Sequence, residues 1–179
     1  LTAGSWAGSL LDRLAPLTTP ERQVLAWFQP RTPALFQPDQ FPVFNLLVEE
    51  GRYYGFPVFG VPGFKVGKYH HLGEGADPDQ QDRECQPRDE AVLRDFTERY
   101  FPEAAGATMA LKTCMFTNSP DEHFIIDTLP EDPRVSFAAG FSGHGFKFCS
   151  VVGEIMADLA QRGATRHDIE LFRLGRFGE

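Results

Sequence analysis

The stretch RVSFAAGFSGHGFKFCSVVGEIMADLAQRG, residues 134–163, predicts a strand, a glycine-containing loop and a helix in direct succession. Residues 134–139 have the β-branched and aromatic content of a short strand. Residues 148–162 carry apolar side chains at helical spacing, and Gly163 suits a left-handed C-terminal cap. Glycines before a helix allow close approach of a ligand, and the helix N-terminus favours an anion. The stretch therefore predicts a phosphate or carboxylate site, with a plain strand–helix connection as the alternative.

Two residues of this loop favour the ligand site. His144 lies between Gly143 and Gly145, and Lys147 falls in the first turn of the predicted helix. A lysine is disfavoured beside the positive end of a helix dipole. We therefore expect an anionic group in front of Lys147.

The composition is that of a packed globular protein with neither nucleic acid nor a membrane as its partner. The 179 residues carry a formal charge of −8 without a basic run, and 42% of them are apolar. No apolar run approaches the roughly 20 residues of a membrane-spanning helix. Three cysteines without a C-x-x-C pair favour a reduced, cytoplasmic protein over a disulfide scaffold or a zinc site.

The remaining sequence alternates between strands and helices in the manner of an α+β protein. Hydrophobic spacing predicts helices over residues 5–14 and 89–101, in addition to the helix over 148–162. The predicted strands are residues 22–28, 43–48, 52–59, 64–71, 108–117, 124–128 and 134–139. We expect a mixed or antiparallel sheet of five or more strands, flanked by these helices.

Two other chemistries fit the sequence less well. A serine nucleophile elbow needs a glycine two places after the serine, whereas His144 stands there after Ser142. Two groups could supply metal ligands, but neither has a recognised ligand spacing. They are His70, His71 and Asp77, and Glu122, His123 and Asp127.

Three motifs, in this order, carry a family resemblance: YYGFPVFGVPGFKVGKYHH (residues 53–71), KTCMFTNSPDEHFIID (112–127) and AAGFSGHGFKF (138–148). Together they resemble the monomeric sarcosine oxidase and N-methyltryptophan oxidase family of FAD-dependent amine oxidases. The resemblance runs over nearly the whole chain. It implies a two-domain fold, in which an FAD-binding domain is interleaved with a substrate domain built on a mixed sheet.

The resemblance implies that this chain is the second half of such an oxidase. Residues 1–20 would end a first FAD-domain segment, 21–117 would form the substrate domain with helix 89–101, and 118–179 would return to the FAD domain with a flavin loop over 140–148. The G-x-G-x-x-G fingerprint of the family's first half is absent. The missing N-terminal FAD-binding half is therefore an implied partner, and we expect this fragment alone to be inactive.

The activity that the resemblance implies is the oxidation of a secondary or N-methyl amino acid to an imine. FAD is the implied cofactor, molecular oxygen the acceptor and hydrogen peroxide the product. The alternative is a truncated, catalytically silent fragment that acts as a binding or assembly module.

The resemblance assigns roles to residues of the predicted substrate domain. Cys114 matches the cysteine that attaches covalently to the flavin, and Lys112 on the same strand face is expected to lower its pKa. Lys65 matches a lysine that activates oxygen, where a cation stabilises the anion that forms first. Tyr54 matches an active-site tyrosine.

The family's active-site histidine follows a glycine with one residue between them. Here Lys68 and Tyr69 both separate Gly67 from His70, so one residue is extra. The resemblance therefore assigns the catalytic role to His70 in preference to His71.

The glycine loop receives its roles from the resemblance as well. Lys147 matches the lysine that pairs with the substrate carboxylate. The loop residues implied to lie against flavin and substrate are Gly143, His144, Gly145 and Phe146.

Overall fold

The computed structural model describes residues 1–178, and the chain divides into two compact units. One unit, the split unit, comprises Leu1–Glu21 and Met115–Glu179. The other, the central unit, comprises Arg22–Cys114. Helices and strands occur in both, so the predicted α+β class is confirmed. Their assignment to FAD-domain segments and a substrate domain stays a prediction.

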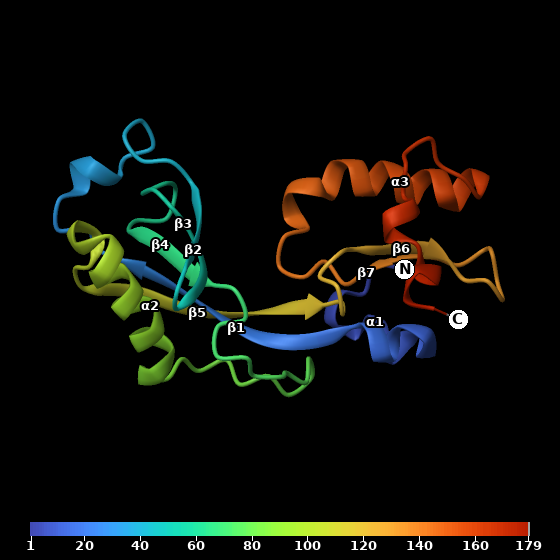
Figure 1. Ribbon diagram of the computed structural model, residues 1–179, viewed down its shortest axis with the longest axis horizontal. Helices are drawn as coiled ribbons and strands as arrows, with labels where there is room; N and C mark the ends of the chain where they lie inside the picture. The colour runs from blue at the N-terminus through green and yellow to red at the C-terminus, as the bar shows by residue number, and fades with distance from the viewer. Residues whose placement is uncertain (179) are drawn as a thin grey trace. The chain divides into compact units, whose positions relative to one another are not determined.

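The central unit is built on a five-stranded sheet with the order β2-β3-β4-β1-β5 (Figure 1). Its strands are β1 (Thr19–Phe28), β2 (Phe44–Val48), β3 (Gly51–Phe56), β4 (Phe64–Lys68) and β5 (Thr108–Asn118). Antiparallel pairing joins β2 to β3, β3 to β4 and β4 to β1. The two strands predicted over residues 43–48 and 52–59 form a hairpin, in which Val48 pairs with Gly51 across the turn.

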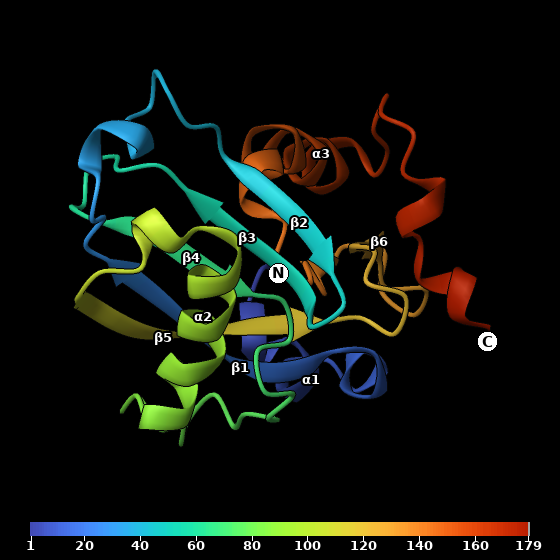
Figure 2. The same cartoon turned by 60° about the vertical axis from the view of Figure 1, so that its left-hand side comes forward.

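One face of this sheet is covered by α2 (Pro87–Tyr100), as Figure 2 shows. Leu93 and Phe96 of this helix belong to one buried core with Phe64 of the sheet. The Tyr53 ring stacks on Phe96, with 3.8 Å between the ring centroids. Because side chains alternate along a strand, every second residue points to the opposite face of the sheet, which we call the outer face.

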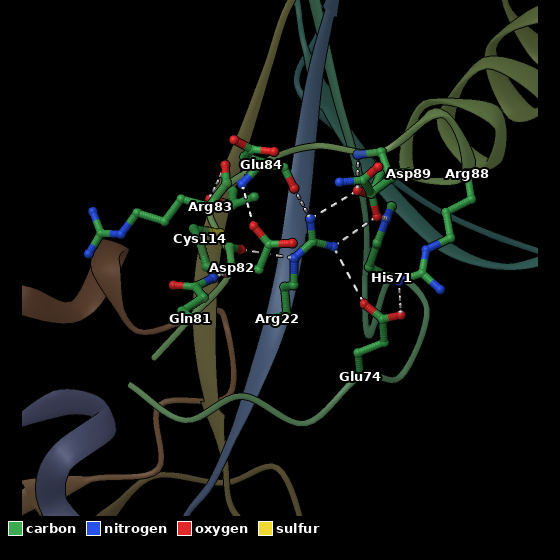
Figure 3. A network of polar contacts seen from close by, with 12 residues as sticks. Arg22, His71, Glu74, Gln81, Asp82, Arg83, Glu84, Arg88, Asp89 and Cys114 are labelled. Atoms are coloured by element: carbon green, nitrogen blue, oxygen red, sulfur yellow. Dashed lines mark hydrogen bonds and ion pairs between the residues drawn. The ribbon is translucent and has the colours of Figure 1, made fainter. Parts of the chain in front are cut away.

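A buried ion pair joins the first turn of α2 to β1 (Figure 3). The Arg22 guanidinium donates to both carboxylate oxygens of Asp89, at 2.8 and 2.9 Å. It also donates to the backbone carbonyls of Asp82 and Glu84. Asp89 accepts a further bond from the Gln86 amide, which completes a capping box at the start of α2.

His71 completes this buried network. Its side chain is fully buried, and its Nε2 lies 3.1 Å from a carboxylate oxygen of Asp89. Burial lowers the pKa of His71, so we assign a neutral ring that donates from Nε2. Burial alone would raise the pKa of Asp89, but hydrogen bonds from Arg22, the Gln86 amide and His71 hold it well below its usual range.

We expect stability to fall as the pH drops below about 4, the ordinary pKa of an aspartate. The pKa of Asp89 is depressed in the folded chain, and the hydrogen bond from Arg176 depresses that of Asp121 in the split unit. A depressed folded-state pKa contributes stability above the unfolded-state pKa, and this contribution is lost as pH falls through the folded value. The lowered pKa of His71 adds a loss below about pH 6.5.

Asp89→Asn tests this account in urea unfolding of the full-length protein at neutral and acidic pH. The variant should be less stable by about 3–5 kcal/mol at neutral pH, because it leaves the buried Arg22 charge with only the more distant Glu74 carboxylate, 3.5 Å away. It should also lose less stability than the wild type on acidification. Asp132→Asn, in an exposed pair with Arg134, is the matched control and should change little. An unaltered pH dependence in Asp89→Asn would contradict the assignment.

The split unit combines a hairpin with a helix. β6 (Ile125–Thr128) pairs antiparallel with β7 (Ser136–Ala139), and α3 (Cys149–Arg162) packs on this hairpin (Figure 1). Val152, Ile155 and Leu159 of α3 share a buried core with Phe124, Ile126 and Ala138. Gly163 ends α3 in the left-handed conformation, with φ 70°. The predicted strand, loop and helix are confirmed, although β7 begins two residues later than expected.

The single helix predicted over residues 5–14 is wrong. The chain forms three short helices there: Gly4–Trp6, α1 (Ala7–Leu10) and Asp12–Leu17. Leu11 interrupts them with an extended backbone, φ −132° and ψ 109°. Ser5 caps no helix, since its hydroxyl lies 2.9 Å from that of Thr117.

Two strand predictions extend too far. β3 ends at Phe56 rather than 59, because Pro57 has no amide hydrogen to continue the ladder. β4 ends at Lys68 rather than 71, because His70 and His71 have positive φ values of 60° and 32°. Within residues 1–178, no helix is long and apolar enough to cross a bilayer.

Candidate functional site

The outer face of the central sheet carries Tyr54 and Lys65. Their strand neighbours Tyr53 and Val66 are buried in the core beneath α2, so alternation places these two on the other side. Tyr54 pairs across the ladder with Gly67, and its ring occupies the space beside that glycine. A Cβ at position 67 would lie 2.6 Å from the Tyr54 hydroxyl oxygen. Burial raises the pKa of Tyr54, which therefore stays a neutral phenol.

Cys114 lies on β5 as a half-buried free thiol. Burial raises the pKa of this thiol, and the Lys65 ammonium lowers it in part. Lys112 was predicted to be the activating cation, but its charge bears on Cys85 instead. The cation whose charge affects Cys114 is Lys65 of β4, a strand that β1 separates from β5 in the sheet.

The two adjacent histidines occupy different surroundings. The His71 side chain is fully buried against Asp89, whereas His70 is partly exposed in the turn after β4. Their positive φ values place both in the left-handed region, which is rare for residues other than glycine. His71 is thus committed to the buried network, and His70 is the member of the pair that a ligand can reach.

The glycine loop of the split unit is built around a buried serine. Gly140, Ser142 and Gly143 have positive φ values of 61°, 47° and 76°. The Ser142 hydroxyl donates to the Gly140 carbonyl at 3.1 Å and accepts from the Ser119 amide at 3.2 Å. Gly143 lies against the Phe116 ring, where a Cβ would clash. Ser142 therefore holds the loop together, a role that explains its burial without any nucleophilic function.

A cavity of about 620 Å³ lies in the split unit beside this loop. Gly143, Gly145 and Phe146, all predicted to contact the flavin, are among its lining residues, as are Cys149 and Met156 of α3. A Cβ at Gly143 or Gly145 would clash with the side chain of Phe116 or Phe141, so both glycines let the loop pack closely on these side chains. The packed loop forms one wall of the cavity.

His144 and Lys147 are absent from the lining of that cavity. His144 Nε2 lies 3.0 Å from the Glu122 carbonyl oxygen, and its ring packs on Phe124. Lys147 lies in the 3-10 turn Phe146–Phe148, before α3, and its Nζ donates to the His144 carbonyl at 2.8 Å. Lys147 therefore precedes α3 rather than lying in its first turn. The anionic ligand expected in front of it stays a prediction.

Two residues of the outer face received no role from the sequence, although Phe56 lies within the motif of residues 53–71. Trp27 and Phe56 pair directly with Lys65 from its two neighbouring strands. Their rings lie beside the Lys65 ammonium, with 5.2 and 4.9 Å between Nζ and the ring centroids. The alternation of β1 signals that Trp27 faces away from the core, but only the sheet register brings it to Lys65.

Comparisons with known proteins agree with the three sequence motifs. The sequence profile of the FAD dependent oxidoreductase family matches residues 1–159. A monomeric sarcosine oxidase from Bacillus sp. (strain NS-129) is 48% identical over 181 residues, covering 98% of this chain and 46% of that protein. An N-methyl-L-tryptophan oxidase from Yersinia pestis (strain Pestoides F) is 38% identical, covering 99% of this chain and 47% of that protein. The chain thus spans about half the length of these curated relatives.

Solved structures share the fold. Fructosyl amine:oxygen oxidoreductase (Amadoriase I) from Aspergillus fumigatus matches with a TM-score of 0.74 and 22% identity, over 96% of this chain and 41% of that one. L-proline dehydrogenase from P. horikoshii matches with a TM-score of 0.75 and 21% identity, over 98% and 45%. At this level of identity the solved structures show a shared fold only. The family assignment comes from the sequence profile, which matches most of the chain. The chain therefore belongs to the FAD dependent oxidoreductase family.

Proposed function

We propose that this chain supplies the substrate sheet and a flavin loop of an oxidase for secondary or N-methyl amino acids. Oxygen is the proposed acceptor, and the products are an imine and hydrogen peroxide. The names of relatives at 38–48% identity support this choice of substrates. The observation that carries it is the shared outer face of Tyr54 and Lys65, with the Lys65 charge acting on Cys114.

The residues of this chain fit the ring of a flavin better than its phosphates. The 179 residues contain no G-x-G-x-x-G fingerprint. They do contain a thiol influenced by a cation, and a glycine loop that lines a large cavity. When bound, FAD supplies the chemistry, accepting a hydride equivalent from the carbon beside the amine nitrogen and passing two electrons to oxygen. The polypeptide supplies orientation and charge.

Each proposed role follows from the chemistry of the side chain. Cys114 would hold the flavin covalently through a thioether, and its thiolate is favoured by the Lys65 charge. Lys65 would stabilise the negative charge that oxygen acquires as it is reduced. Tyr54 stays protonated and can donate a hydrogen bond, and His70 is the partly exposed histidine of the turn after β4.

The glycine loop would serve the carboxylate end of the substrate. Lys147 is exposed; its ammonium donates to the His144 carbonyl and lies 4.9 Å from the Phe148 ring centroid. A carboxylate is a stronger acceptor than a carbonyl for an ammonium, so a substrate could take over this bond. Gly143, Gly145 and Phe146 would lie against the cofactor.

A substrate panel on the full-length protein tests the proposed function. Sarcosine, N-methyltryptophan and proline should each be compared with the matching primary amino acid, by following peroxide and oxygen together. We expect peroxide from at least one secondary amine, in equal amount to the oxygen consumed. A protein that retains FAD yet oxidises none of them, or oxidises only primary amines, would contradict the proposal. A colourless protein that binds a partner would instead support the silent module.

Cys114→Ser should release the flavin from the full-length protein on acid denaturation. A serine hydroxyl cannot form the thioether that a thiolate forms. Absorbance of the precipitate and of the supernatant distinguishes bound from released flavin. The matched controls are Cys85→Ser and Cys149→Ser, the other free cysteines of residues 1–178, which should keep the flavin with the precipitate. Flavin that stays attached in Cys114→Ser would refute this assignment.

A further inference from the structure

Lys65 stands at the centre of a row across three strands. On the outer face, Phe56 of β3 and Trp27 of β1 are its direct partners in the ladder. Its Nζ lies 4.9 Å from the Phe56 ring centroid and 5.2 Å from that of Trp27. These residues also line a cavity of about 190 Å³, with Pro57, Phe59 and Val61. An ammonium group is thus held between two aromatic rings at the wall of an apolar cavity.

No carboxylate partners this ammonium within residues 1–178, where its contacts are the two rings. A carboxylate would fix the position of the ammonium but would also cancel much of its charge. An aromatic ring attracts a cation through its quadrupole while carrying no net charge. We call the two rings on either side of the Lys65 ammonium, those of Trp27 and Phe56, the aromatic box. This box can hold the ammonium in place and leave its full positive charge for a neighbouring anion.

We propose that Trp27 and Phe56 are positioning residues that set the reactivity of Lys65 toward reduced oxygen. The inference rests on the proposed oxygen-activating role of Lys65 and adds the means by which its charge is held. Lysine has four rotatable bonds, so a rate that depends on one ammonium position needs a restraint. The two rings provide this restraint from both sides of the strand.

The kinetic test separates the two half-reactions of the full-length protein. Trp27→Leu should slow reoxidation of the reduced flavin about 10–30-fold. The rate of Trp27→Phe should lie between those of the wild type and Trp27→Leu, because phenylalanine attracts a cation less than tryptophan does and leucine has no ring. Phe56→Leu should act in the same direction. Anaerobic reduction by substrate should stay within about twofold of the wild type. Equal losses in both half-reactions would overturn the inference.

Fluorinated tryptophan isolates the electrostatics from the shape. Successive ring fluorination at position 27 weakens the quadrupole while the packing stays nearly constant. Reoxidation should slow progressively with each added fluorine, a trend that a merely structural role would not produce. Trp6 in the split unit, which is 40% exposed, is the matched control, and fluorination there should leave the rate unchanged. A rate at position 27 that does not respond to fluorination would refute the positioning role.

A measurement without turnover keeps this inference separate from the proposed function. After reductive methylation with ¹³C-formaldehyde, the dimethylammonium resonance of Lys65 should lie upfield of those of the other lysines, because of the two ring currents. Lys65→Arg assigns the resonance, and Trp27→Leu should move it downfield. If Lys65→Met leaves reoxidation unchanged, the oxygen-activating role is wrong. The Lys65 resonance of the wild type still shows whether the two rings surround the ammonium. A Lys65 resonance that does not shift in Trp27→Leu would show that the Trp27 ring does not hold the Lys65 ammonium.

Discussion

Lys65→Met is expected to slow reoxidation of the reduced flavin by oxygen about 10²–10³-fold in the full-length protein, the usual loss when one preorganised electrostatic group is removed. Oxygen acquires negative charge as it is reduced, and the Lys65 ammonium is a cation whose charge is not neutralised by an acidic partner in the described part of the chain. Methionine keeps an unbranched apolar side chain of similar length but removes the charge. Stopped-flow mixing of the reduced protein with oxygen measures this step alone.

Lys68→Met is the matched control for this prediction. Lys68 lies on the same strand, three residues on, and its ammonium lies over the Tyr53 ring, on the core side of the sheet. Its loss should leave reoxidation close to the wild-type rate. Equal losses in the reductive and oxidative half-reactions of Lys65→Met would mean that Lys65 positions the cofactor or the fold instead.

Lys147→Ala is expected to weaken the binding of carboxylate ligands by about 2–5 kcal/mol, the range for removing one member of a desolvated charge pair. We expect the lower end of that range, because the ammonium must first give up the His144 carbonyl. Acetate and the isosteric but neutral acetamide form a matched pair of ligands. Titration of the flavin absorbance should show a large loss for acetate and almost none for acetamide.

An exposed cation of the same unit provides the control for Lys147. Arg134 pairs only with Asp132 at the surface, and Arg134→Ala should leave acetate binding unchanged. Tight acetate binding retained in Lys147→Ala, with an unaltered circular dichroism spectrum, would mean that the loop serves the cofactor or the chain geometry. Equal losses for acetate and acetamide would point to a disturbed cavity.

Local sequence patterns predicted those helices and strands that depend on residue spacing and nearby turn residues alone. The 3.6-residue spacing and Gly163 predicted α3, and two apolar runs on either side of residues 49–51 predicted the strands of the first hairpin. The same spacing overpredicted a helix over residues 5–14, where the extended Leu11 interrupts it. The end of β4 was missed because the positive φ of His71 depends on a partner, Asp89, that is distant in sequence.

In the candidate site, too, some features follow from the local sequence and others depend on residues that are distant in the sequence. Motifs alone pointed to Lys65, Tyr54 and Cys114, because these residues stand at family positions. The rings around Lys65 come from its two neighbouring strands, so they depend on the register of the sheet. The cation that acts on Cys114 comes from a strand beyond β1, so it depends on the strand order. Lys147 illustrates a third case: the sequence spacing did not show that it lies in a 3-10 turn before α3 and donates to the His144 carbonyl.

Anaerobic titration of the full-length protein with a secondary amino acid tests the central claim most directly. The claim is that this chain belongs to the machinery of a flavin-dependent amine oxidase. We predict that sarcosine or another N-methyl amino acid bleaches the flavin absorbance in the absence of oxygen. Admission of air should then restore it, with one peroxide formed for each flavin reoxidised. A bound flavin that no secondary amino acid reduces would contradict the account.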